Sequence, residues 1–262
     1  MSQTFFAGAG SNSYVYGPGQ IGPKQGIYEV STTQNASLGS KLLFDDGREF
    51  AYSKANGTAA AGTLVAPDQS AQSVVEIDGK CTAAAIGATS VIITDAGTLG
   101  SATADQYAGA MLQITDDAGE GHQYKIKSNT AAATNAVTFT LYDGLVVALT
   151  TASDVAIVGA LSNEVVIASA GTDYAPVGVT PVAVVDGEYF WRQTKGTALI
   201  LQDGTVAAGD ILTLSDGVNG AVQAGAGGGT AVADLIAEAI VGYALYAGDD
   251  TGHVGVKLQI GN

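Results

Sequence analysis

Apolar residues in this chain fall into short runs, many of them alternating with polar residues, and turn dipeptides separate the runs. Alternation with a period of two places successive side chains on opposite faces of a strand. Asn-Gly and Asp-Gly tolerate the positive φ that tight turns need. Turn dipeptides of this kind occur at Asp46-Gly47, Asn56-Gly57, Asp78-Gly79, Asp143-Gly144, Asp186-Gly187, Asp203-Gly204, Asp216-Gly217 and Asn219-Gly220. The runs that predict strands are residues 90–94, 137–142, 154–158, 164–167, 177–185, 197–201, 210–214 and 254–260.

Many short strands between turns are typical of an all-β protein, so the sequence predicts a β-barrel or sandwich rather than βαβ units. Composition points the same way. Charged residues make up 13% of the chain, about half the roughly 25% of an ordinary domain, and 36 of 262 residues are glycine. Long exposed helices need charged outer faces, so they are disfavoured. We expect only short helices, at residues 34–42, 103–111 and 232–239, with Thr103 and Asp105 as N-caps of the second.

A sequence pattern that occurs twice predicts how the chain is divided into domains. Asp46-Gly-Arg-Glu-Phe50 precedes Asn56-Gly-Thr-Ala-Ala-Ala-Gly, and Asp186-Gly-Glu-Tyr-Phe190 precedes Asp203-Gly-Thr-Val-Ala-Ala-Gly. Similar hairpins near both ends indicate one β body, while the segment between them shifts to an Ala, Thr and Ser composition. The predicted organisation is an extended N-terminal arm at 1–26, a main β body at 27–73 and 161–262, and an inserted β domain at 74–160.

The predicted arm is rich in glycine, and Pro18 and Pro23 lie within it, so it has no periodic apolar face. A disordered tail is one interpretation, because chain termini are commonly loose. However, large apolar side chains are scattered through it, and a linker has no use for them. We therefore expect an arm that contacts a capsid or a neighbouring subunit through Phe5, Phe6, Tyr14, Tyr16 and Ile21.

The charge balance excludes some partners. Ten Lys and Arg against 25 Asp and Glu give a net charge of −15, which opposes binding to nucleic acid and to anionic membrane surfaces. There is no run of about 18 apolar residues, and the first ten residues lack a basic region followed by an apolar one. We expect synthesis in a host cytoplasm without a signal peptide. Cys81 is the only cysteine, so no intramolecular disulfide can form.

Groups for catalysis are scarce. The chain has two histidines and one cysteine, so carboxylates are the only plentiful candidates for catalysis. A glycosidase could use two carboxylates, but it would also need aromatic side chains to bind sugar rings, and Trp191 is the only tryptophan. The acidic clusters at 116–122 and at Asp249-Asp250 lack the spacing of a calcium loop. The glycine run at 225–229 lacks the lysine of a phosphate loop. We predict a protein that is not an enzyme, with no metal and no cofactor.

An aromatic strand is predicted around Trp191. Alternation places Tyr189 and Trp191 on one face and Phe190 on the other. Such a strand packs either in a core or at a subunit interface. Core is the first interpretation here, and an interface formed by Tyr189 and Trp191 is the second.

Several stretches resemble virion structural proteins of tailed bacteriophages, most closely capsid decoration or cement proteins. They are the glycine-rich arm, Tyr28-Glu-Val-Ser-Thr-Thr-Gln-Asn-Ala-Ser-Leu38, Asp46-Gly-Arg-Glu-Phe50, Asp105-Gln-Tyr-Ala-Gly109, Gly119-Glu-Gly-His-Gln-Tyr-Lys-Ile126 and Val241-Gly-Tyr-Ala-Leu245. The resemblance implies a β-rich protein, often a homotrimer, bound to the outside of a capsid and bridging major capsid protein subunits. It implies no catalytic residues.

Two other functions are open. A tail, fibre or baseplate component would bind host surface glycans, with residues 74–160 as the receptor module. The other is an enzyme whose catalytic groups are carboxylates, and the scarcity of histidine and of clustered aromatic residues counts against this interpretation.

Overall fold

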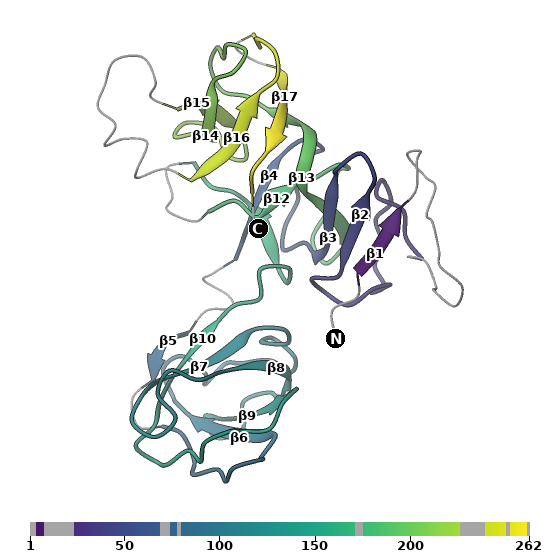
Figure 1. Ribbon diagram of the computed structural model, residues 1–262. Helices are drawn as coiled ribbons and strands as arrows, with labels where there is room; N and C mark the ends of the chain where they lie inside the picture. Colours follow the sequence, from purple (N-terminus) through teal and green to yellow (C-terminus); the bar gives the residue numbers. More distant parts are fainter. Residues whose placement is uncertain are drawn as a thin grey trace. The chain divides into compact units, whose positions relative to one another are not determined.

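A computed structural model describes residues 4–7, 24–68, 74–77, 80–170, 175–225, 239–249 and 252–260. Within these residues the protein is all-β, with strands β1 to β17 and no helix, which confirms the predicted fold class (Figure 1). No helix in the described part of the chain is long and apolar enough to cross a membrane.

The predicted helices at 34–42 and 103–111 are wrong. Both segments form turns, and the first leads directly into a strand. In the second, Asp105 and Gly109 have φ of 60° and 87°, which no right-handed helix accepts. Segments of two turns are too short to form helices without tertiary support. Residues 232–238 of the third predicted helix lie outside the described residues.

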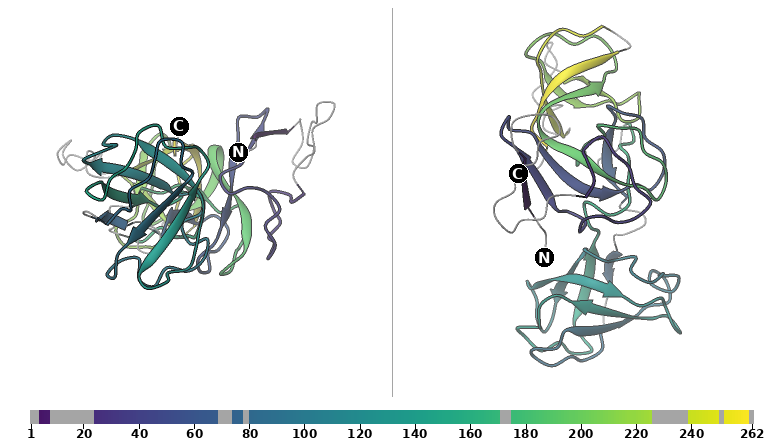
Figure 2. Two further views of the ribbon diagram at one scale, coloured as in Figure 1. Left: turned by 90° about the horizontal axis from the view of Figure 1, so that it is seen from below. Right: turned by 90° about the vertical axis from the view of Figure 1, so that its right-hand side faces the viewer.

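The chain divides into two compact units. Unit 1 comprises Met1–Pro67 and Glu164–Asn262, and unit 2 comprises Asp68–Asn163. Unit 2 is thus an insertion between two segments of unit 1, and its boundaries lie six residues before and three residues after those expected from composition. Figure 2 shows the two units in further views.

Unit 1 is built on one large sheet. Its strands are β1 (Thr4–Ala7), β2 (Lys41–Phe44), β3 (Glu49–Lys54), β4 (Leu64–Pro67), β11 (Val165–Ile167), β12 (Gly178–Val179), β13 (Tyr189–Leu201), β14 (Ile211–Leu214), β15 (Val222–Ala224), β16 (Ile240–Ala244) and β17 (His253–Leu258). The order is β1-β2-β3-β13-β17-β16-β14-β15, and β4 joins through β12 and pairs with β11. The long strand β13 holds the unit together, because its first half pairs with β3 and its second half with β17.

The core of unit 1 follows from the alternation in these strands. Ala198, Ile200, Val254 and Val256 point into one apolar cluster, which also contains residues of β14 and β16. Where β13 pairs with β3, Trp191 and Phe190 enter different clusters. Tyr189 packs against the cluster that contains Trp191, which confirms the predicted faces of this strand.

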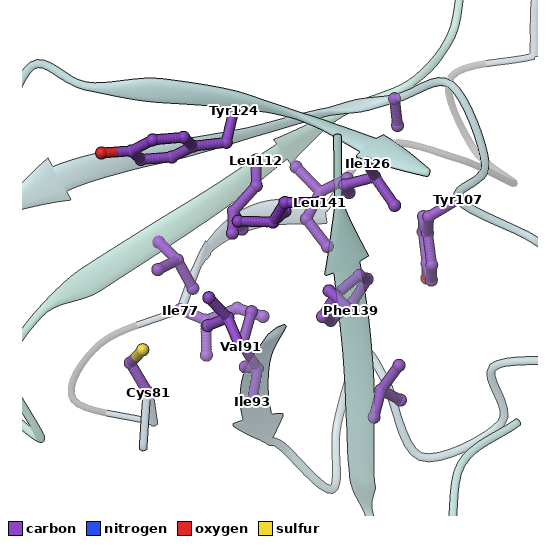
Figure 3. Packing of buried hydrophobic residues seen from close by; sticks show 14 of the residues in the cluster. Ile77, Cys81, Val91, Ile93, Tyr107, Leu112, Tyr124, Ile126, Phe139 and Leu141 are labelled. Atoms are coloured by element: carbon purple, nitrogen blue, oxygen red, sulfur yellow. The ribbon is translucent and has the colours of Figure 1, made fainter. Parts of the chain in front are cut away.

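Unit 2 is a six-stranded sheet that returns on itself. Its strands are β5 (Val74–Ile77), β6 (Ser90–Thr94), β7 (Met111–Asp116), β8 (Gln123–Asn129), β9 (Ala136–Leu141) and β10 (Asp154–Val158), in the order β5-β10-β7-β8-β9-β6. Residues 80–82, which follow β5, pair with β6 at the other edge through Thr82 N to Ile92 O (2.8 Å) and Thr94 N to Lys80 O (3.0 Å). The pairing therefore closes a small barrel. Its interior holds the apolar side chains drawn in Figure 3, such as Leu112, Ile126 and Phe139.

Candidate functional site

The residues expected in the N-terminal arm are only partly described. Phe5 and Phe6 belong to β1, whose backbone pairs in parallel with β2 at Leu42 and Leu43. This places β1 at the edge of the unit 1 sheet. Tyr14, Tyr16 and Ile21 lie outside the described residues, so contact of these five side chains with a capsid or a neighbour stays a prediction.

Gln25, near the end of the predicted arm, belongs to the body. Its side chain is 3% exposed, its Nε2 donates to Tyr189 O (2.7 Å), and its Oε1 accepts from the hydroxyl of Tyr52 (2.7 Å). Its carbonyl oxygen accepts from Trp191 Nε1 (2.9 Å). Sequence reasoning missed this network, because nothing in the chain before residue 26 marks one glutamine as a core residue.

Trp191 is completely buried and Tyr189 is half-buried. Tyr52 lies against both rings, stacked on Tyr189 (centroids 6.0 Å apart) and edge-on to Trp191 (4.9 Å). Trp191 is therefore a core residue of unit 1, the first of the two interpretations. A subunit interface involving Tyr189 stays a prediction.

Arg192 is a further buried polar residue of β13. Its Nε donates to Ser53 Oγ (2.7 Å) and its Nη1 to the carbonyl oxygen of Val177. Burial lowers the pKa of this guanidinium to about 10, so the group is still a cation at neutral pH. Its bonds join β13 to β3 and to the residue that precedes β12. Because only 4% of the residue is exposed, it is not accessible to a ligand.

The acidic segment 116–122 forms the turn between β7 and β8. Asp117, Gly119 and Gly121 adopt positive φ, and His122 Nδ1 lies 2.9 Å from Gly119 O. Among the residues that the structure describes, no three His, Cys, Asp or Glu side chains gather as they would around a metal ion. Asp250 and residues 226–229 of the glycine run lie outside the described residues.

A surface with several exposed apolar side chains lies on the outward side of β13 and β17 and at the end of β16. We call it the outer face and define it by six residues: Thr197, Leu199, Tyr243, Leu245, Tyr246 and Lys257. Strand register places Thr197, Lys257 and Tyr243 in one row and Leu199, Gly255 and Leu245 in the next. The apolar members are between 38% and 55% exposed, although their sheet neighbours on the other side are buried.

The outer face is pre-formed. A Cβ at Gly255 would meet Tyr246 Cε1 at 2.6 Å, so the tyrosine ring lies directly on the glycine. Lys257 and His253 are exposed here, and the outward residues of β17 and of the second half of β13 include no carboxylate. In a chain of net charge −15, this surface carries one lysine, and the exposed Asp249 follows Tyr246 by three residues.

An open cleft of about 460 Å³ adjoins the outer face. Leu199, Thr197 and His253 line one side of it, and Tyr28 and Arg48 are among the residues that line the rest. Arg48 is engaged with Asp46 (Nε to Oδ2, 2.7 Å). The cleft widens the apolar surface, and its lining also includes the polar side chains of Thr180 and Gln193.

A second apolar surface lies at one end of the unit 2 barrel. Ile86 and Val146 are the most exposed large hydrophobic side chains that the structure describes, at 69% and 62%. Their backbones are fixed, because Gly87 N donates to Leu145 O (2.7 Å) and Leu145 N to Ala88 O (3.0 Å). We call this surface, with the 47% exposed Tyr142, the barrel end.

The β7–β8 turn and the start of β8 contact the segment that carries Val146. Gly119 of the turn lies against the buried Leu149, and Tyr124 Oη of β8 accepts from Val146 N (3.1 Å). That turn carries three exposed carboxylates, and a fourth follows Tyr142. These four are Asp116, Asp117, Glu120 and Asp143. A cation is also present, because Lys125 Nζ lies 5.8 Å from the centre of the Tyr142 ring.

No protein-family model, curated protein or solved structure matches this chain.

Proposed function

We propose that the chain is a non-enzymatic structural protein of a phage virion that binds the outer surface of the assembled capsid. There it bridges major capsid protein subunits as a homotrimer and stabilises the shell. The observation that carries a binding role is the pair of exposed apolar surfaces. The outer face lies mainly on strands, and the barrel end lies on turns whose backbones are hydrogen-bonded to each other. Pre-formed surfaces lose little conformational entropy on association.

The phage assignment is supported by the resemblance of six stretches of the chain to capsid decoration proteins. The edge strand β1 is consistent with an arm that reaches a neighbour, because a sheet edge offers unpaired backbone groups. Contacts of modest strength that repeat around a trimer would combine into firm attachment.

The test uses shells of the phage that encodes the chain, purified without this protein. Wild-type protein is added, and its copy number per shell and the shell's thermal stability are measured. We expect saturation at hundreds of copies and a higher temperature of shell disruption, because a ligand of the assembled state stabilises it. Binding of only a handful of copies, or binding to host glycans instead, would favour the tail or baseplate function.

The arm is tested in the same assay with a deletion of residues 2–23, which keeps the buried Gln25. A matched variant keeps the length but replaces Phe5, Phe6, Tyr14 and Tyr16 by serine. We expect both variants to reduce occupancy of the shell. Undiminished occupancy would refute the arm's role while leaving capsid binding intact.

A further inference from the structure

We infer that the second half of β13 is an acceptor edge, to which an extended polypeptide segment of a partner protein adds as a further strand. We call this edge the open edge and define it by Thr197, Ala198 and Leu199, which all line the cleft of unit 1. Backbone pairing within unit 1 supports the proposal, so it is independent of the phage assignment.

The second half of β13 is paired along one edge. From Gly196 to Leu201 it pairs in register with β17. Alternate residues of an antiparallel strand direct their N–H and C=O groups to opposite edges. Leu201 N donates to Gly62 O (2.8 Å), so Leu201 directs its backbone groups away from β17. Leu199 and Thr197, two and four residues earlier, therefore direct theirs away from β17 as well.

The N–H groups on this second edge are free. Gln193 Nε2 donates to Thr197 O (2.8 Å), but within the described ranges no group accepts from the N–H of Thr197 or of Leu199. Gly255, opposite Leu199 in β17, uses its carbonyl oxygen for Leu245 N (2.8 Å) on its far side. Free N–H groups at this two-residue spacing match the carbonyl groups of a second extended polypeptide, which is the chemistry of strand addition.

The open edge is reachable from outside. Leu199 is 55% exposed and Thr197 is also exposed, and both lie along the cleft of about 460 Å³. An added strand would place alternate side chains beside those of Thr197 and Leu199. Apolar and β-branched residues are favourable cross-strand neighbours for these two. The partner segment is therefore one that carries apolar or β-branched residues at alternate positions.

The open edge has room for a short segment. At one end Gly62 occupies the position beside Leu201. At the other end Gly196 has a left-handed φ of 84°, which breaks the extended conformation of β13. Arg48 lies directly against this glycine, since a Cβ there would meet Arg48 Cα at 2.8 Å. At about 3.3 Å per residue, roughly three to five residues fit between these ends.

Two proline substitutions compare the open edge with the paired one. Leu199→Pro removes an N–H that the fold leaves free, whereas Ala198→Pro removes one directed to β17. Proline is tolerated in a strand where its N–H faces an open edge. We expect Leu199→Pro to retain cooperative urea unfolding and Ala198→Pro to lose most of its stability. In the wild type, hydrogen exchange should be faster at the Leu199 amide than at the amides of Ala198 and Ile200.

Binding is measured by NMR with the full-length protein and the peptide acetyl-Thr-Val-Thr-Val-Thr-amide. We expect a dissociation constant below ~1 mM and protection of the Leu199 amide from exchange in the complex. Leu199→Pro should weaken binding about tenfold, because a main-chain hydrogen bond is lost. Leu199→Ala keeps the N–H and should weaken binding less. The same peptide with every amide N-methylated is the control and should not bind.

Other outcomes contradict the proposal. A Leu199 amide that exchanges as slowly as its neighbours would show that the edge is already occupied in the folded protein. A peptide that does not bind, or that binds Leu199→Pro as well as wild type, would equally overturn strand addition. Binding that appears only after deletion of residues 2–23 would show that the chain's own N-terminal segment fills the edge, which excludes a partner there. The shell-binding assay is separate, so failure of strand addition and failure of capsid binding can be told apart.

Discussion

Cys81 has 3% of its surface exposed and belongs to the apolar cluster inside unit 2 (Figure 3). Burial raises the pKa of its thiol to about 11, because the thiolate is poorly solvated there. The thiolate is the reactive form of cysteine, so the folded protein holds this group inert. A lone cysteine in the sequence indicated only that no intramolecular disulfide forms; its protection comes from tertiary packing.

We predict that a thiol reagent at pH 8 leaves the folded protein unmodified and modifies it stoichiometrically in denaturing urea.

The raised pKa of Cys81 also has a consequence at alkaline pH. Because the unfolded thiol loses its proton near pH 9 and the folded one near pH 11, the contribution of Cys81 to stability is present below pH 9 and lost as the pH rises towards 11. Urea titrations of wild type and Cys81→Ala at pH 8 and 10.5 measure this. Equal pH dependence of the two proteins would contradict it.

Trp191 and Gln25 show how far one residue can be predicted. Alternation in the sequence placed Trp191 and Tyr189 on one face of a strand, and the structure confirms it. The bond from Trp191 Nε1 to the carbonyl of Gln25 joins residues 166 positions apart, and no local pattern identifies such a partner.

The two similar segments that begin at Asp46 and Asp186 have equivalent glycines in the same backbone conformation. In the two copies, Gly47 matches Gly187 and Gly62 matches Gly209, and all four have φ between 76° and 88°. Five of the eight predicted turn dipeptides have a glycine with positive φ, because left-handed φ is a local property of the chain; Gly144 and Gly217 do not adopt it, and Gly79 lies outside the described residues. The lengths of the strands were less predictable. Segment 177–185 contributes only the two-residue strand β12, whereas the aromatic strand predicted around Trp191 and the strand predicted at 197–201 form one strand, β13.

Two glycines with the same backbone conformation allow strain and packing to be separated. Gly204 (φ 76°) has open space around it, whereas a Cβ at Gly220 (φ 73°) would overlap Thr63 Cγ2 and approach Ile167 Cγ2 at 3.0 Å. We predict that Gly204→Ala costs about 1 kcal/mol from left-handed strain alone. Gly220→Ala should cost a further ~1–3 kcal/mol because its neighbours must move. Urea denaturation of both variants compares them; equal losses of stability would contradict the packing term.

Unit 2 enters and leaves the chain at adjacent strands. Inside unit 2, β5 and β10 pair, with Ile77 opposite Val155. Inside unit 1, the flanking strands β4 and β11 also pair, with Pro67 opposite Val165. Each unit therefore has its two connections side by side and its own apolar core, which is the arrangement of a domain insertion.

We predict that replacing residues 68–164 by a four-residue glycine-containing turn leaves unit 1 folded, because the turn only has to join strands that are already neighbours. Residues 68–163 expressed alone should also fold, with Cys81 protected from reagent. Circular dichroism, cooperative urea unfolding and thiol labelling check both halves. Loss of cooperative unfolding in the shortened chain would show that unit 1 depends on the insertion.

The fold class and most of the turns could be predicted from the order of residues, since strand alternation and glycine conformation are properties of neighbouring residues. The outer face and the barrel end could not. Leu199 and Ile200 are alike in sequence, yet one is 55% exposed and the other fully buried. That difference arises from which side of β13 faces the core. Ile86 and Val146 come together because two segments some 60 residues apart in the chain are hydrogen-bonded to each other in unit 2.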